Sequence, residues 1–287
     1  MTKLLEVTAL KIGFIGAGKV GCSLAKYFAI HGLSVTGFFS KTTASAQEAA
    51  QFTESNFYPS TEALIADSDM IFLTVTDGAI QTVWDSIKGE ALTGKIICHC
   101  SGSLSSGIFS DIQQYGAYGY SIHPLYAIPS KTTSYKDLAH TMFTLEGDAT
   151  YLPQIQSLLE ALGNSVQVIA TESKAKYHAA AVFASNHMLA LAKVATDLLK
   201  DCGFTDETAL TAITPLMEGN LAHLVSDGPV SALTGPVERA DVTTISRHLG
   251  CLPEDMVPLY KELSKILVQL GKEKHPKTDY SALEKLL

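Results

Sequence analysis

A glycine-rich turn between an apolar strand and a helix constrains this chain more than any other feature. The stretch from Lys11 to Gly21 has the sequence KIGFIGAGKVG, and its last three glycines, Gly16, Gly18 and Gly21, are spaced as G-x-G-x-x-G. The apolar run before them is typical of a strand covered by helices on both faces. Apolar side chains then recur at helical spacing as far as Gly32. Strand, tight turn and helix in this order predict the opening unit of a nucleotide-binding parallel sheet.

Each glycine has its own physical role in such a turn. Gly16 permits the sharp change of direction, Gly18 lets a diphosphate approach bare backbone, and Gly21 lets the helix pack closely on the strand. The helix N-terminus adds unpaired N–H groups and a partial positive charge. The alternative is a glycine-rich turn that serves the fold alone. We expect a dinucleotide to bind here, over Gly16, Ala17, Gly18, Lys19, Val20 and Gly21.

The end of the second predicted strand indicates which dinucleotide is preferred. This strand, Leu33 to Phe39, is followed by Ser40 and Lys41, with no carboxylate before Ala44. A carboxylate here would accept hydrogen bonds from a ribose 2′-hydroxyl, whereas hydroxyls and a cation suit a 2′-phosphate. The cofactor is therefore predicted to be NADP, unless Lys41 is only a solvated loop lysine. Two further cofactor contacts are expected near the ends of later strands, at Thr74 and Ser101.

Strands and helices alternate as far as Ala170, after which every segment has helical periodicity. The predicted fold class is α/β, with an N-terminal Rossmann domain on a mostly parallel sheet (1–170) and an all-α domain for substrate binding and dimerisation (171–287). Further strands are expected at Met70–Thr76, Lys95–Cys100, Tyr118–Ile122, Thr141–Leu145 and Ser165–Ile169. Helices are expected at Ala44–Phe52, Ser60–Ala66, Asp77–Ile87 (with Asp77 as its N-cap), Tyr151–Leu162, Glu172–Asp201, Asp206–Ile213, Pro215–Ser226, Asp241–Leu249, Glu254–Leu270 and Tyr280–Leu286.

Charge and composition favour a small-molecule substrate. The net charge is −8 and no basic run occurs, which argues against nucleic acid and against an anionic membrane as the main partner. Met1 to Leu10 has no signal-peptide pattern, so a cytoplasmic location is expected. The stretch Ala179–Ala195 is interrupted by polar residues and is predicted to be a buried helix rather than a membrane span. Five scattered cysteines predict reduced thiols, and no metal site is expected.

Hydride transfer from a nicotinamide needs a partner that protonates the developing alkoxide or amine. His123 is the first candidate because it follows a predicted strand and precedes the rigid Pro124. It could equally be a histidine that only caps the sheet edge. The long predicted helix supplies Lys176 and His178, although Lys176 also fits a solvated helix face. Farther along, Asn186 in an apolar run should be hydrogen bonded to something fixed or to a ligand, since a buried unpaired amide is costly.

A charged turn late in the chain is the other unusual stretch. Ser231 to Asp241, SALTGPVERAD, places Glu238 and Arg239 in a loop between apolar helices. Arg239 could hold a substrate carboxylate in a bidentate pair. Alternatively, both residues pair with neighbours and stabilise the turn.

The combined motifs resemble a known family. GAGKVG, HCSG, HPLYA, KYHAAAVFASNHMLAL and ALTGPVERAD are similar to those of two-domain Rossmann proteins whose helical half is a domain of unknown function. That family resembles a branch of the 6-phosphogluconate dehydrogenase-like superfamily, with ketopantoate reductase, 3-hydroxyisobutyrate dehydrogenase and pyrroline-5-carboxylate reductase as relatives. The resemblance implies an NADP-linked reductase with its active site between the domains and a homodimer formed through helices.

The resemblance also implies a lysine one helical turn before an asparagine. Matching Asn186 puts Val182 at the lysine position, and matching Lys176 puts Ala180 at the asparagine position. Because the pair is incomplete in both registers, His178 or His123 is expected to transfer the proton. Some members of the similar family are thought to reduce ketopantoate, so a 2-oxoacid is the expected substrate class and an imine the second choice. A protein that binds NADP without turnover, as a sensor or an assembly protein, is the alternative.

Overall fold

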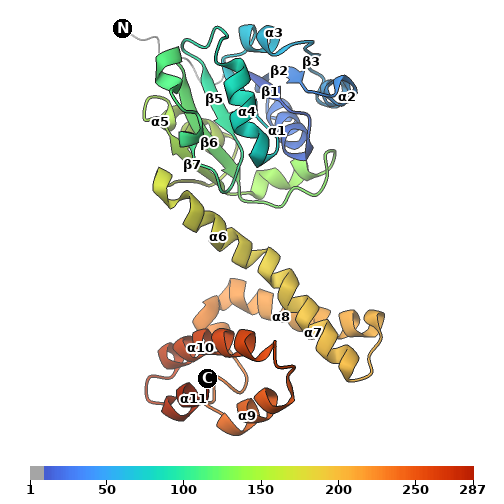
Figure 1. Ribbon diagram of the computed structural model, residues 1–287, viewed down its shortest axis with the longest axis vertical. Coiled ribbons are helices and arrows are strands. Elements are labelled where there is room, and N and C mark those ends of the chain that lie inside the picture. The colour runs from blue at the N-terminus through green and yellow to red at the C-terminus, as the bar shows by residue number, and fades with distance from the viewer. Residues whose placement is uncertain (1–9) are drawn as a thin grey trace. The chain divides into compact units, whose positions relative to one another are not determined.

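The computed structural model describes residues 10–287 and divides into two compact units, of which the first ends at Asn186 and the second begins at His187 (Figure 1). The predicted domain boundary at residue 170 stays a prediction. No helix in the described part of the chain is long and apolar enough to cross a membrane.

The first unit is built on an eight-stranded sheet with the strand order β3-β2-β1-β4-β5-β6-β7-β8. All neighbouring strands are parallel except β6 and β7. The predicted α/β class with a mostly parallel sheet is confirmed. Only β3 was not predicted, because two residues are too few to show a periodicity. The strands are β1 (Lys11–Ile15), β2 (Ser34–Phe39), β3 (Asn56–Phe57), β4 (Met70–Leu73), β5 (Ile96–His99), β6 (Tyr118–Pro124), β7 (Phe143–Gly147) and β8 (Val166–Val168).

Helices and short 3₁₀ turns cover both faces of this sheet (Figure 1). On one face, Phe14 of β1 lies between the rings of Phe38 and Phe72, each 5.3 Å away between centroids. On the other face, Trp84 is fully buried against Phe109. The first face is covered by α1 (Lys19–Ile30), α2 (Thr43–Thr53), η4 (Ser134–His140) and α5 (Leu152–Ala161), and the second by α3 (Thr61–Ala66), α4 (Asp77–Ile87), η2 (Ser106–Ile108) and η3 (Ile112–Tyr115).

Residues 171–287 contain only helices and turns, as predicted. After η5 (Thr171–Ser173) the helices are α6 (Lys174–Ala184), α7 (Asn186–Asp201), α8 (Asp206–Ala232), α9 (Val242–Cys251), α10 (Val257–Lys274) and α11 (Ser281–Leu286).

The prediction of one continuous helix over Glu172–Asp201 is wrong, because the helix breaks at Ser185. There the backbone leaves helical geometry (φ −123°, ψ −76°). The Ser185 hydroxyl donates to the carbonyl of Ala181 over 2.7 Å, a local bond that competes with the regular helical pattern.

The stretch Ala179–Ala195 is also not the buried helix that its apolar composition predicted. No residue of α7 is buried, and Asn186 is exposed, so the argument for Asn186 from the cost of burial does not apply.

Helix α8 corrects a further prediction, in which Pro215 separated two helices. The helix continues through Pro215 and leaves helical geometry only at Gly228 (φ 77°). A proline removes one backbone hydrogen bond, whereas a positive φ ends the regular helix outright.

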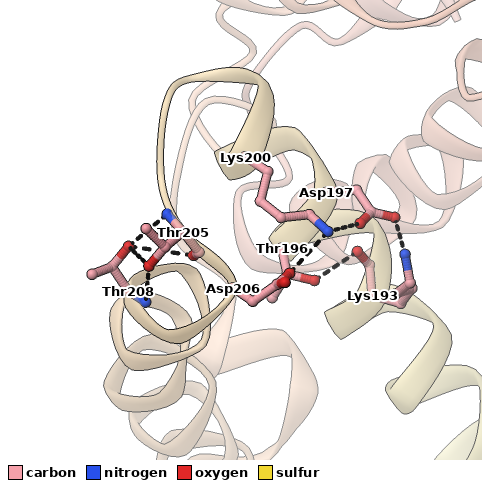
Figure 2. A network of polar contacts seen from close by, with 7 residues as sticks. All are labelled: Lys193, Thr196, Asp197, Lys200, Thr205, Asp206 and Thr208. Atoms are coloured by element: carbon pink, nitrogen blue, oxygen red, sulfur yellow. Dashed lines mark hydrogen bonds and ion pairs between the residues drawn. The ribbon is translucent and has the colours of Figure 1, made fainter.

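The turn between α7 and α8 is held by polar side chains (Figure 2). Lys200 Nζ lies 3.1 Å from Asp197 and 3.0 Å from Asp206. Thr205 and Thr208 exchange side-chain and backbone hydrogen bonds in a capping box that starts α8.

Candidate functional site

The glycine turn has the geometry that a diphosphate requires. Gly16 has φ +111°, which an L side chain rarely adopts. A Cβ on Gly21 would lie 2.4 Å from Thr74 Oγ1, so this glycine permits the close contact of α1 with the strand end. A Cβ on Gly18, in contrast, would meet only the Thr74 carbonyl at 3.8 Å. Gly18 thus leaves open space at the start of α1, whose first-turn N–H groups have no helical acceptor.

A cleft of about 350 Å³ adjoins this turn. Thr74 lies in it, but its hydroxyl donates to the Gly16 carbonyl over 2.8 Å, so Thr74 holds the turn in shape. The other lining residues are Gly18, Lys19, Val20, Leu73, Val75, Thr76, Asp77, Cys100, Ser101 and Ile128. The residues present fit a dinucleotide, with bare backbone where the phosphates would bind.

The predicted 2′-phosphate residues follow β2 directly. Lys41 is exposed and Ser40 half-buried. Thr42 is the N-cap of α2, but its hydroxyl makes no capping bond to that helix. A phosphate at this position would meet hydroxyls and the Lys41 ammonium, which has no ion-pair partner within residues 10–287.

The loop after β5 is held rigidly beside the cleft. Asp77, predicted to be the N-cap of α4, does not have that role: Thr76 is the N-cap. Instead, the Asp77 carboxylate accepts hydrogen bonds from the hydroxyls of Ser101 (2.8 Å) and Ser103 (3.0 Å). The Asp77 carboxylate binds this loop rather than capping α4, because the loop supplies it with two hydroxyl donors.

His99, at the end of β5, also holds this loop through hydrogen bonds. Its Nδ1 accepts the Ser101 backbone N–H over 3.2 Å, and its Nε2 lies 3.1 Å from the Ser105 carbonyl. One nitrogen therefore accepts and the other donates, which is the pattern of a neutral ring. Burial lowers the pKa of His99 to about 4, consistent with that pattern.

His123 and Tyr177 form the centre of a group of proton-carrying side chains. His123 lies within β6 rather than after it, and its Nδ1 is 2.7 Å from the Tyr177 hydroxyl. Burial, followed by the charge of Lys174, lowers the pKa of His123 to about 3. The ring is therefore neutral at pH 7, where one nitrogen donates a hydrogen bond and the other accepts one, but it is not a cationic acid.

Lys174, which sequence reasoning missed, is the buried lysine of the site. It opens α6 with 2% of its surface exposed, and its Nζ lies 5.3 Å from the centroid of the Tyr177 ring. Nζ has no hydrogen-bond partner among residues 10–287. Burial is the main reason that the pKa of Lys174 falls to about 8, and the charge of Glu146 opposes the fall. Its spacing could have indicated it, because Lys174 lies one helical turn before His178 and therefore on the same face of α6 as that candidate.

His178 completes the group from the same helix. Its Nδ1 is buried without a partner in the described chain. A Cβ on Gly102 would lie 2.6 Å from that nitrogen and 3.0 Å from His123 Nε2, so the two imidazoles converge on the loop after β5. Beside them is a chamber of about 540 Å³, lined by His123, Leu125, Tyr126, Ala127, Tyr177, His178, Ala180, Ala181, Val182, Ala184, Ser185 and Asn186.

Other predicted site residues are not part of this group in the first unit. Lys176 is exposed on α6. Glu238 belongs to the second unit, where it pairs with Lys274 (2.9 Å) and His275 (3.0 Å). Hydrogen bonds from His275 and then Lys274 lower the pKa of Glu238. Arg239 is exposed, and its role as a carboxylate partner stays a prediction.

These features define a Rossmann-type fold with a buried lysine, a tyrosine and two histidines near the cleft at its glycine turn. Among residues 10–287, no three His, Cys, Asp or Glu side chains are grouped as metal ligands.

The family matches agree with this fold. Residues 2–124 match the model of a Rossmann-like domain, and residues 141–266 match that of a domain of unknown function, DUF2520. The chain is a two-domain protein that joins a Rossmann-like domain to a DUF2520 domain, which confirms the resemblance stated from its motifs. No curated protein matches the chain at a significant level.

Solved structures share the fold over almost the whole chain. Protein TM1727 from Thermotoga maritima is 27% identical with a TM-score of 0.72, and the match covers 92% of this chain and 99% of that one. A protein from Bacteroides fragilis that is proposed to be an NADP oxidoreductase is 24% identical, with a TM-score of 0.71 and coverage of 92% and 100%. A reductive aminase from Aspergillus terreus, solved with NADPH and ethyl-5-oxohexanoate, is 20% identical, with a TM-score of 0.61 and coverage of 98% and 100%.

Proposed function

We propose that this protein is an NADPH-dependent reductase of a small carbonyl compound or imine. The observation that carries the proposal is the ammonium group of Lys174, which is buried without a hydrogen-bond acceptor among the described residues. Its charge acts on Asp77 and Cys100 of the cleft and on His123 of the chamber. A buried ammonium that lacks an acceptor costs at least ~1–3 kcal/mol, so the site is built for an acceptor that arrives with a ligand.

The proposed roles of the residues follow from their protonation states. Reduced nicotinamide supplies a hydride when it is bound. Lys174 donates a proton to the carbonyl oxygen or imine nitrogen of the substrate. The neutral pair of His123 and Tyr177 fixes that atom by hydrogen bonding. His178, whose Nδ1 has no hydrogen-bond partner among the described residues, is a further contact for the substrate.

Two substrate classes remain within this proposal. A ketopantoate-like 2-oxoacid is the class that the family resemblance of the motifs implies. A C=N substrate is supported by the solved relative from Aspergillus terreus that is called a reductive aminase. Both classes need the same hydride and the same proton, so a geometry built around one proton donor serves either.

The test is a turnover assay. The purified protein is mixed with NADPH and a panel of 2-oxoacids and cyclic imines, while the absorbance of the reduced nicotinamide is followed. Consumption of NADPH with one of the two classes is expected. If no compound on a broad panel is reduced while NADPH binds and changes the oligomeric state, the protein is a nucleotide-binding sensor and the reductase proposal is wrong.

Replacing Lys41 with alanine is expected to weaken NADPH binding about 10-fold or more while leaving NADH binding nearly unchanged, because only NADPH carries the 2′-phosphate. Fluorescence titration of both variants with both nucleotides measures this. Lys265→Ala, at an exposed lysine paired with Glu262, is the matched control. A wild-type protein that binds NADH as tightly as NADPH would contradict the cofactor assignment.

Homodimerisation through the helical half is a further part of the proposal. Large apolar side chains of α8 are exposed, including Leu216 (65%), Leu221 (52%) and Val225 (79%). Exposed apolar side chains in such number favour a protein interface. Sedimentation velocity is expected to show a dimer, and Leu221→Glu with Val225→Glu should shift it toward monomer; a monomeric wild type would rule the dimer out.

A further inference from the structure

Glu146 is a buried carboxylate that neither the sequence motifs nor the proposed reaction accounts for. It lies on β7 opposite Ser121 of β6 and exposes only 1% of its surface. It accepts three hydrogen bonds, from the backbone N–H of Ser106 (2.6 Å), the hydroxyl of Ser106 (2.8 Å) and the hydroxyl of Thr171 (2.9 Å). Burial of a charge is costly unless it is paired, so this degree of satisfaction indicates a fixed position.

The two partners belong to the two segments that carry the site. Ser106 opens η2, directly after the loop that presents Ser101. Thr171 opens η5, the turn that leads into Lys174 at the start of α6. One carboxylate therefore ties the loop at the nucleotide cleft to the turn that bears the buried lysine.

Glu146 is also the main charge that favours the protonated form of Lys174. Burial lowers the pKa of Lys174, and Glu146 opposes this more than Cys100 or Asp77 does. Cys100 is a neutral thiol, because burial raises its pKa to about 12. Three further groups near Lys174 carry no charge at pH 7. They are the ring of Tyr177 and the imidazoles of His99 and His123.

We propose that Glu146 is a positioning residue of this site, which joins the loop after β5 to the turn before α6 and so fixes Lys174 at the start of α6 without touching the substrate. This inference rests on the proposed reductase function for its catalytic meaning. Its physical content is a coupling between Glu146 and Lys174, which can be measured without turnover.

The test compares Glu146→Gln with wild type by NMR titration of the lysine side-chain nitrogens in ¹⁵N-lysine-labelled protein, with the Lys174 signal assigned from Lys174→Met. Removal of the carboxylate charge should lower the pKa of Lys174 below its wild-type value. In the turnover assay, the loss of activity at high pH should begin at a correspondingly lower pH. If that shift is one unit, turnover at pH 8 falls several-fold and turnover at pH 6 is nearly retained.

Thr171→Val is the matched variant for a purely structural role, because it removes one hydrogen bond to Glu146 and leaves the charge in place. It should reduce the melting temperature or turnover with little change in the Lys174 titration. An unchanged Lys174 titration in folded Glu146→Gln overturns the proposal. If Glu146→Gln does not fold, Glu146→Asp withdraws the charge by one methylene and must still lower the pKa of Lys174. If the wild type shows no turnover but the Lys174 titration still shifts in Glu146→Gln, the reductase function is wrong and the coupling between Glu146 and Lys174 is supported.

Discussion

Replacement of Lys174 by methionine is expected to lower turnover by about 10²- to 10⁴-fold, the usual contribution of a positioned general acid. NADPH affinity should change little, because Lys174 does not line the nucleotide cleft. The measurement is steady-state kinetics combined with fluorescence titration of NADPH. Lys265→Met, at an exposed lysine paired with Glu262, is the control.

The pH dependence of the wild type provides a second readout of the same residue. An ammonium donor is active only while it is protonated, so turnover should be level below pH 8 and fall above it, since the pKa of Lys174 is about 8. His123 as a cationic acid would instead lose activity above its pKa of about 3, far below that range. A break near pH 8 that disappears in Lys174→Met identifies the donor. If Lys176→Met shows the larger loss, the functional lysine is Lys176, one of the candidates named from the sequence, and not Lys174.

The second large effect is expected at Gly18. A Cβ at this position meets nothing closer than the Thr74 carbonyl at 3.8 Å, so Gly18→Ala should fold with a nearly unchanged melting temperature. The methyl group nevertheless occupies the space through which a diphosphate approaches the backbone. NADPH should therefore bind about 10-fold more weakly or worse, a loss of ~1.4 kcal/mol or more.

Gly21→Ala is the contrasting variant. Its Cβ would lie 2.4 Å from Thr74 Oγ1 and 2.6 Å from the Gly16 carbonyl, where the backbone has no room to move. Overpacking of this kind costs about 1–3 kcal/mol of folding free energy. Thermal unfolding and NADPH titration of both variants separate the two effects. If Gly18→Ala binds NADPH as tightly as wild type, the nucleotide does not rest on this turn.

Much of the fold can be predicted from the sequence because it depends on local periodicity. Buried parallel strands such as β1 and β4 are short apolar runs, and the helix after the glycine turn has a regular apolar stripe. Features in which a side chain can bond either to a local partner or to one distant in the sequence could not be predicted. Asp77 has the composition of an N-cap, yet its carboxylate binds Ser101 and Ser103 across the sheet edge.

The candidate site divides in the same way. The glycine turn could be predicted residue by residue, because its chemistry uses backbone within one continuous segment. Lys174 and Lys176 are two positions apart on one alanine-rich helix whose sequence shows no clear apolar face. Only the packing of α6 decides that Lys174 is buried near Tyr177 while Lys176 faces solvent.

The sequence alone determined most of the order of strands and helices, the glycine turn and the absence of a carboxylate after β2, because each of these is a property of neighbouring residues. Tertiary structure alone decided which side chains share a site: His123 from β6, Lys174 and His178 from α6, and Glu146 from β7. Their burial and mutual charge set their protonation states, and burial is a property of the packed chain rather than of any segment.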